Sequence, residues 1–337
     1  MTIVNDQTKG FTTACVSALF LSMTGICIRY LTTVERMEPL VLAFWRNFFL
    51  TIILFLVLEC LFPMLVEISR SDLAKMAVFG LLLALFNFLW TTSVAINGAA
   101  VATFLVYSSV PFTAIFGKIL LGETLNLSKI IAVSLALFGC LLVSGTFGVT
   151  TGISLNGIFC GLGAGLCFAF YTIMGRSSRS NGLNSWTIML YSFGFAAFFL
   201  LAAKCLMTMR ADGGASVLPS LFSLGTSVSG WGVLLLLAAG PTLIGFGLFN
   251  VSLGYLPSHS VNLITTAEPP LTAIFAFFIF GETLSLDQLV GAGFILAAFI
   301  LLKAAGRKRF SGEREEPAHR GTAIASQTAS RGMATIK

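Results

Sequence analysis

Charged residues are scarce in this chain. Asp, Glu, Lys and Arg together make up 10% of its 337 residues, whereas hydrophobic residues make up 56% and the mean hydropathy is +0.93. Soluble globular domains carry about 25% charged residues, so this composition excludes a soluble protein and indicates a chain that crosses a membrane several times. Histidine occurs only at positions 259 and 319, which excludes a histidine-based metal site.

Motifs of common enzyme chemistry are absent as well. The sequence has no phosphate-binding loop of the form GxxxxGKS or GxxxxGKT, no GxSxG elbow and no HExxH helix. Its seven cysteines form no CxxC pair and lie in or beside apolar runs, which argues against a disulfide framework or a thiolate metal site. We therefore expect no enzyme activity, no metal and no cofactor, with an intramembrane enzyme as the alternative. Energy for moving a solute must come from a gradient or from exchange.

Long apolar runs fill most of the chain. About 20 mostly apolar residues are needed to cross a bilayer, and ten runs qualify: 11–31, 39–61, 73–95, 98–121, 128–147, 154–175, 185–206, 230–253, 259–280 and 286–304. The predicted fold is an all-α polytopic membrane protein with ten transmembrane helices in a lipid bilayer. The first run is too long for a signal-peptide core and lacks a cleavage pattern, so we expect it to be retained. The polar stretch 305–337 is predicted to be a disordered tail.

Basic residues set the predicted orientation. With residues 1–10 in the cytoplasm, eleven Lys and Arg residues near span ends fall inside: Lys9, Arg70, Lys75, Lys118, Lys129, Arg176, Arg179, Lys303, Arg307, Lys308 and Arg309. Four fall outside, namely Arg29, Arg36, Lys204 and Arg210. The positive-inside rule then places both termini in the cytoplasm. The net charge of +6 follows from this topology and the tail, so no nucleic-acid partner is expected.

The chain contains an internal duplication. Residues 111–127 match residues 270–286 at 10 of 17 positions without a gap, and residues 19–29 align with residues 166–176. This predicts two repeats, 11–147 and 154–304, of five helices each. Because five is odd, a helix and its copy cross the bilayer in opposite directions, so the repeats are inverted. Inverted repeats around one midplane site are the geometric basis of alternating access.

Each repeat also carries a proline in its fourth helix, then an apolar run and a Gly-Glu pair. The second copy runs from Glu268-Pro269 to Gly281-Glu282, and the first runs from Val110-Pro111 to Gly122-Glu123, without a Glu before its proline. Over about residues 11–304 this pattern resembles the EamA family of the drug/metabolite transporter superfamily. The resemblance implies a ten-helix carrier in a bacterial-type inner membrane with cytoplasmic termini. It leaves the solute open, because that family handles amino acids, nucleoside-like metabolites, vitamins and toxic compounds.

The prolines predict helix breaks at equivalent places. Pro111, Pro269 and Pro270 cannot donate to the carbonyl four residues earlier, and unpaired carbonyls in hydrocarbon need another partner. Polar residues gather there, namely Tyr107, Ser108, Thr265, Thr266 and Glu268. We expect a polar cavity at the breaks near the midplane. A kink solvated by its own Ser and Thr hydroxyls is the alternative.

Two charged residues, Arg46 and Glu268, lie well inside apolar runs and away from the run ends. A carboxyl such as Glu268 within a span is costly unless it is paired, protonated or hydrated, so it could bind a cation, couple transport to protons, or stay neutral in the kink. Arg46 could hold a solute carboxylate, snorkel to the interface, or pair with Glu268 as a gate. If both charges face the cavity, a zwitterionic, amino-acid-like solute satisfies them.

Other polar and aromatic residues complete the predicted substrate site. Asn87, Trp90, Asn250 and Asn262 could stack on or hydrogen-bond to a solute, with helix packing as the alternative. We assign Glu123 and Glu282 to loop structure, and we expect His259 at the membrane interface.

The predicted function is secondary transport of a small polar, amino-acid-like metabolite by alternating access, as an exporter by family analogy. One alternative is uptake of a nucleoside-like or vitamin metabolite, with Trp90 and Tyr107 stacking on its ring. Another is a non-transporting membrane scaffold or a flippase subunit. The sequence leaves open whether the protein forms a homodimer.

Overall fold

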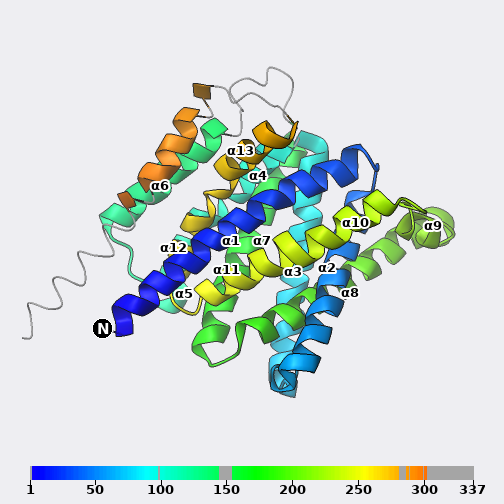
Figure 1. Cartoon of the computed structure of the whole chain (residues 1–337), viewed down its shortest axis with the longest axis horizontal. Coiled ribbons are helices and arrows are strands. Elements are labelled where there is room, and N and C mark those ends of the chain that lie inside the picture. Colours follow the sequence, from blue (N-terminus) through cyan, green and yellow to red (C-terminus); the bar gives the residue numbers. More distant parts are fainter. Residues whose placement is uncertain are drawn as a thin grey trace, which may run out of the picture.

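The structure is a computed structural model that describes residues 2–97, 99–143, 154–280, 286–287, 289–298 and 300–301. Within these residues every regular element is a helix and no strand occurs. The long helices pack side by side and cross one another at moderate angles in a bundle (Figure 1). Three sequence predictions, namely the role of Glu282, the tail 305–337 and part of the run 286–304, lie outside the described residues.

Helices of the first half are α1 (Thr2–Thr33), α2 (Pro39–Leu61), α3 (Arg70–Asn97), α4 (Ala99–Val106), α5 (Ser109–Leu121) and α6 (Leu127–Val143), with the 3-10 turn η1 (Pro63–Leu65). Helices of the second half are α7 (Leu155–Ser180), α8 (Ser185–Asp212), α9 (Val217–Leu221), α10 (Val228–Leu237), α11 (Gly247–Ser252), α12 (Ser258–Thr265) and α13 (Glu268–Phe280). A π-helical segment, η3 (Ala238–Phe246), joins α10 to α11.

Seven helical segments of the described residues are long and apolar enough to span a membrane. They are Asp6–Thr32, Pro39–Leu61, Arg70–Ser93, Ala102–Leu121, Leu155–Ser180, Ser185–Ala211 and Val228–Ser252. Two further apolar helices, Leu127–Leu142 and Leu289–Ala298, are shorter. The predicted run 259–280 is divided into α12 and α13, which explains why it does not count as one long helix. The predicted membrane protein is confirmed at this level, seven long spans with shorter apolar helices.

Prolines divide helices at the two predicted places. The α4–α5 chain turns at Tyr107-Ser108, three residues before Pro111, and the α12–α13 chain turns at Thr266-Ala267, directly before Glu268 and the proline pair. A third irregularity, the π-helical segment η3 within the span Val228–Ser252, was not predicted. Pro241 lies inside η3, where it cannot donate to the carbonyl of Leu237, and the hydroxyl of Thr242 donates to that carbonyl instead at 2.7 Å.

The two halves pack on each other reciprocally. Helix α1 packs against α12 and α13 of the second half, and α7 packs against α4 and α5 of the first half. Small residues make these approaches possible, because a Cβ added to Gly161 on α7 would lie 2.6 Å from the Cβ of Leu105 on α4. Ala14 and Ala18 on α1 are fully buried. The broken helices of each half are therefore held by the first helix of the other.

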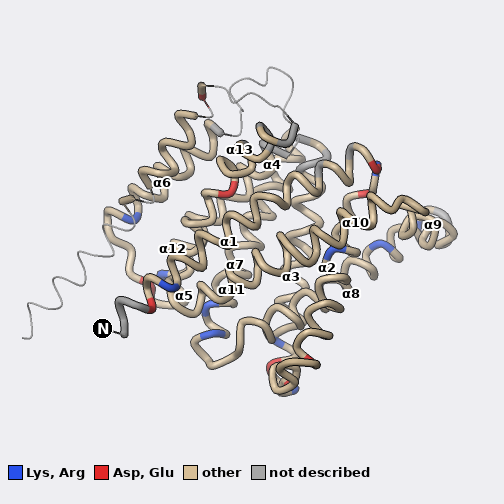
Figure 2. Tube along the Cα trace, viewed as in Figure 1, with Lys and Arg blue, Asp and Glu red and all other residues tan. Residues whose placement is uncertain are grey.

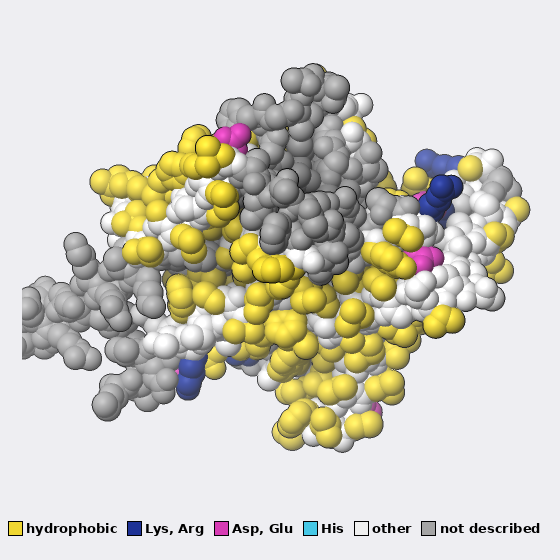
Figure 3. Space-filling model, turned by 45° about the horizontal axis from the view of Figure 1, so that its top comes forward, with side chains coloured by type: hydrophobic (Ala, Val, Ile, Leu, Met, Phe, Trp, Pro, Cys, Tyr) yellow, Lys and Arg dark blue, Asp and Glu magenta, His cyan; other side chains and the backbone are white. Residues whose placement is uncertain are grey.

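Charge and apolar surface are distributed as a membrane requires. Charged residues gather toward helix ends and the links between helices, while long stretches of most helices carry none (Figure 2). Apolar side chains cover much of the described surface on the face that Figure 3 shows. Phe198, Phe278 and Ile300 are more than 60% exposed, and lipid chains would solvate them where water would not.

Candidate functional site

A cavity of about 70 Å³ lies where the broken helices meet. By the same measure one water needs about 10–15 Å³, so several waters fit and a larger solute requires the walls to part. Both halves contribute lining residues: Leu21, Thr24, Arg46, Phe86, Trp90, Thr103, Val106 and Tyr107 from the first, and Phe168, Phe246, Thr265 and Glu268 from the second. Four of the nine predicted solute contacts, Arg46, Trp90, Tyr107 and Glu268, line this one space.

Tyr107 closes the second helix break. Pro269 leaves the Thr265 carbonyl without its helical donor, and the phenol oxygen of Tyr107 lies 3.1 Å from that carbonyl oxygen. The same phenol oxygen lies 2.8 Å from Oε2 of Glu268. Thr266, predicted as a contact, is buried away from the lining, and its hydroxyl donates to the Leu263 carbonyl at 2.7 Å. Thr265 takes its place in the cavity wall.

The first helix break is satisfied differently. Pro111 frees the carbonyl of Tyr107, and the backbone N–H of Val110 donates to it at 3.0 Å, which tightens the chain by one residue. Ser108, a predicted contact, points to the packed face of Gly165 on α7, and its hydroxyl has no hydrogen-bond partner. Ser108 therefore belongs to the contact between α4–α5 and α7 and not to the cavity.

Arg46 is buried in the cavity wall with 3% of its surface exposed, so the snorkelling alternative is wrong. One Nη2 hydrogen is donated to Oδ1 of Asn87, whose Nδ2 donates to the Leu83 carbonyl at 2.8 Å. The Nε atom of Arg46 has no partner. No ion pair within 4.0 Å joins Arg46 to Glu268, although both are described and line the same space. Asn87, which does not itself line the cavity, therefore orients the guanidinium of Arg46.

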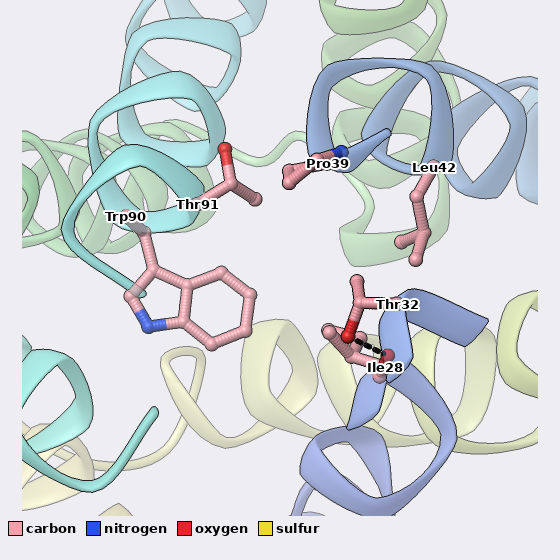
Figure 4. Close-up of a pocket in the computed structure, with 6 residues that line it drawn as sticks. All are labelled: Ile28, Thr32, Pro39, Leu42, Trp90 and Thr91. Carbon is pink, nitrogen blue, oxygen red and sulfur yellow. Dashed lines mark hydrogen bonds between the residues drawn. The ribbon is translucent and has the colours of Figure 1, made fainter. Parts of the chain in front are cut away.

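Trp90 lines both the main cavity and a smaller one of about 20 Å³. In the smaller cavity the indole lies across from Ile28 and Thr32 of α1, and Pro39 and Leu42 of α2 lie above those two residues in the view (Figure 4). This second space is at the end of α1 that leads into α2. Of the residues named as lining either cavity, Trp90 lines both.

Asn250 and Asn262 belong to helix packing. The amide of Asn250 donates to the hydroxyl of Tyr171 at 3.1 Å, and its backbone carbonyl accepts from Ser185 at 3.0 Å. The amide of Asn262 donates to the hydroxyl of Thr113 at 3.3 Å, while its Oδ1 has no partner. Neither asparagine lines the cavity, so the helix-packing alternative describes both.

Several lining residues were missed by the sequence analysis. Thr24 lies three residues after Leu21 on one face of α1, and Thr103 lies one turn before Tyr107. Phe86, Phe168 and Phe246 add aromatic walls, with Phe86 and Phe168 centroids 5.3 Å apart. Among 32 phenylalanines, nothing in the sequence distinguishes these three. Of these residues, only Thr103 could have been predicted to line the cavity, because it lies one helical turn before the predicted break.

A second buried polar cluster lies at the start of α12. Oε1 of Glu123 accepts from the backbone N–H and the hydroxyl of Ser258, both at 2.8 Å, and Oε2 lies 2.6 Å from Nδ1 of His259. Burial alone would raise the pKa of Glu123, but the bonds from His259 and Ser258 outweigh it and leave that pKa below its ordinary value of 4.5. His259, predicted at the membrane interface, lies at the start of α12 with 1% of its surface exposed.

An all-helical membrane bundle with interlocked halves and a charged cavity at their broken helices has the architecture of a membrane transporter. The sequence comparisons agree. The chain belongs to the EamA-like transporter family, whose sequence profile matches residues 8–145 and 155–303. The predicted resemblance is confirmed, and the family matches both halves of the chain.

Relatives carry transporter names. An "uncharacterized transporter" of Archaeoglobus fulgidus is 28% identical over 65% of this chain and 74% of its own. The threonine/homoserine exporter RhtA of Escherichia coli K12 is 30% identical over 43% of this chain and 44% of its own. The inner membrane transporter YicL of Salmonella typhimurium is 23% identical over 89% of this chain and 97% of its own. A solved crystal structure, 12% identical, shares the fold with a TM-score of 0.72 over 89% of this chain and 98% of its own.

Proposed function

We propose that this protein is a secondary transporter that exports a small polar, amino-acid-like metabolite by alternating access. One observation carries the proposal: a single cavity lined by helix breaks of both halves holds an arginine and a carboxyl group, Arg46 and Glu268. Membership of a transporter family supports transport. The exporter name of RhtA supports the outward direction.

The proposed architecture has ten membrane crossings in two inverted repeats, 11–147 and 154–304. In this proposal the protein lies in an inner membrane, and residues 1–10 and the tail 305–337 are on the cytoplasmic side. The reciprocal packing of α1 on α12–α13 and of α7 on α4–α5 supports two equivalent repeats, and five helices in each repeat would make them inverted. The name of YicL, an inner membrane transporter, supports the location.

A zwitterion suits the two charges. Arg46 has an unpartnered Nε inside the wall and could offer its planar fork to a carboxylate. Glu268 and the Thr265 carbonyl could accept from an ammonium group. An ion pair between Arg46 and Glu268, the gate alternative, has no support in this conformation. Because the space is small, solute entry requires the two halves to part on one side.

A second candidate is carriage of a nucleoside-like or vitamin metabolite. The aromatic walls favour it, because the rings of Phe86 and Trp90 are stacked with their planes within 10° and their centroids 6.3 Å apart. A planar solute ring could extend such a stack. The hydroxyl of Tyr107, the other predicted stacking residue, is instead bonded to the Thr265 carbonyl and Glu268 at the second helix break.

A thermal-shift screen of the purified protein with amino acids, nucleosides and vitamins tests the proposal. A ligand at 100 times its Kd stabilises a protein by about 2.7 kcal/mol. We expect amino acids to raise the melting temperature of the wild type but not of Arg46→Met. Shifts given only by nucleosides or vitamins would select the second candidate, and no shift from any of the three classes would contradict both.

A further inference from the structure

The hydroxyl of Tyr107 lies within hydrogen-bonding distance of two other oxygen atoms. Its oxygen lies 3.1 Å from the Thr265 carbonyl oxygen and 2.8 Å from Oε2 of Glu268. A phenol has one hydrogen to donate, a carbonyl can only accept, and an ionised carboxylate can only accept. With an ionised Glu268, one of the two close contacts would bring oxygen lone pairs together without a hydrogen between them.

A proton on Glu268 resolves this count. The carboxylic acid then donates to the phenol oxygen, and the phenol donates to the Thr265 carbonyl, which Pro269 has left without a helical donor. Every group in the chain of three has a partner. Tyr107 and Thr265 are buried, with 4% and 2% of their surface exposed, and Glu268 is half-buried in the cavity wall. In such surroundings an unpaired polar group is disfavoured.

Resting on the transport function proposed above, we propose that Glu268 is a proton-binding site in this conformation, and that the proton exchanges with a primary ammonium group of the solute. When Glu268 loses its proton, the Tyr107 hydrogen turns to the carboxylate and the Thr265 carbonyl loses its donor. The cavity then presents a carboxylate, a carbonyl and a phenol oxygen. These acceptors match the three N–H donors of an ammonium group.

The neighbouring groups are consistent with exchange. Arg46 on α2 lines the same cavity, Tyr107 lies between α4 and α5, and Cys140 on α6 is close enough to interact electrostatically with Glu268. From α1 the lining receives Leu21 and Thr24, which carry no charge. Arg46 stays available for a solute carboxylate. One proton entering for each zwitterion that leaves moves one positive charge inward per cycle.

Infrared difference spectroscopy tests the protonation without any solute. Between neutral and alkaline pH, the wild type should lose the C=O stretch of a carboxylic acid, and Glu268→Gln should lack that band. Glu123→Gln is the matched control, because Glu123 accepts from Ser258 and His259 and needs no proton. This variant should therefore show the same carboxylic-acid band as the wild type. Tyr107→Phe should shift the band. A wild type with no such band, or a band that survives in Glu268→Gln, would overturn the inference.

Proton release on solute binding tests the exchange. In weakly buffered detergent solution, L-threonine should release about one proton per carrier, whereas 2,3-dihydroxybutyrate, which lacks the ammonium group, should release none. Glu268→Gln should release none with either. If L-threonine or another amino acid binds without proton release, or if release depends on sodium in place of pH, exchange is wrong while transport stands. If no amino acid binds, the proposed function fails and the infrared result still decides the protonation.

Discussion

Glu123 and His259 are 136 residues apart in sequence, yet Oε2 of Glu123 lies 2.6 Å from Nδ1 of His259. The other carboxylate oxygen accepts from the backbone N–H of Ser258, the first residue of α12. A carboxylate at that place stabilises the positive end of the helix dipole. The link between α5 and α6 in the first half thus holds the start of α12, whose other end, Thr265, lines the cavity.

Replacing Glu123 should loosen this connection. In Glu123→Ala the Ser258 N–H, its hydroxyl and the His259 ring lose their acceptor, and each unpaired buried donor costs about 1–3 kcal/mol. We expect a clearly lower melting temperature in detergent at pH 7, with Glu123→Gln intermediate because one acceptor oxygen remains. Glu35→Ala is a control, since that carboxylate accepts from the exposed Ser229 hydroxyl and should matter little.

The pH dependence of this contribution has a defined sign. The pKa of Glu123 is lower in the folded protein than its ordinary value of 4.5. A lowered pKa means that the carboxylate stabilises the fold fully above pH 4.5 and that this stability is lost as the pH falls through the folded-state pKa. The difference in melting temperature between the wild type and Glu123→Gln should therefore shrink on acidification below that value. A difference that grows on acidification would contradict the assignment.

Tyr107 and Pro269 should show coupled effects on stability. Tyr107→Phe removes the donor to the Thr265 carbonyl, which Pro269 cannot replace, at a cost of about 1–3 kcal/mol. Pro269→Ala restores a backbone N–H that can reach that carbonyl in a regular helix. We expect Tyr107→Phe to cost less in the Pro269→Ala background, and a double-mutant cycle on thermal stability measures the coupling. Strictly additive effects would show that Tyr107 does not serve this carbonyl.

Asn87 should act on solute affinity through Arg46. Because a hydrogen bond to a charged group is worth about 1.5–3 kcal/mol, Asn87→Ala should weaken binding about 10-fold to 100-fold. Arg46→Lys should also weaken it, because Lys lacks the planar fork. Asn250→Ala is the matched control: its amide is equally buried but bonds to Tyr171, so it should lower stability and leave affinity unchanged. Equal losses of affinity in both alanine variants would argue against a specific role.

Trp90 should control access from the end of α1 that joins α2. Removing the indole in Trp90→Ala would merge the two cavities that it lines. In a cysteine-free background, Thr103→Cys should then react several-fold faster with an impermeant maleimide applied to intact cells. Phe198→Ala, which removes an aromatic side chain that is 63% exposed, is the control. Unchanged labelling in Trp90→Ala would show that the indole is not the barrier.

Features that depend on single conspicuous residues could be predicted from the sequence. Prolines inside apolar runs located the breaks at Pro111 and Pro269, and charges inside apolar runs singled out Arg46 and Glu268. Each is rare in such surroundings for an energetic reason, so its presence is informative without any tertiary structure. Duplication of the proline pattern also led to the family that the profile match established.

Features that depend on which face of a helix turns inward could not be predicted from the sequence. Thr265 lines the cavity and its neighbour Thr266 does not, a difference of one residue and about 100° around the helix. Asn87 was predicted to touch solute, but it lies behind Arg46, 41 residues away in sequence. Pro241 was not predicted as a break, although it too stands in an apolar run, because residues 73–95, the corresponding third run of the first half, contain no proline.

Entrance counterflow in proteoliposomes tests the central claim, that one cavity between the halves carries a solute across the membrane. Vesicles loaded with an unlabelled amino acid panel, L-threonine and L-homoserine included, should transiently accumulate the external radiolabelled counterpart. Arg46→Met and protein-free vesicles should not. If the wild type takes up label no faster than protein-free vesicles for every amino acid tested, the account of an amino-acid-like carrier is contradicted.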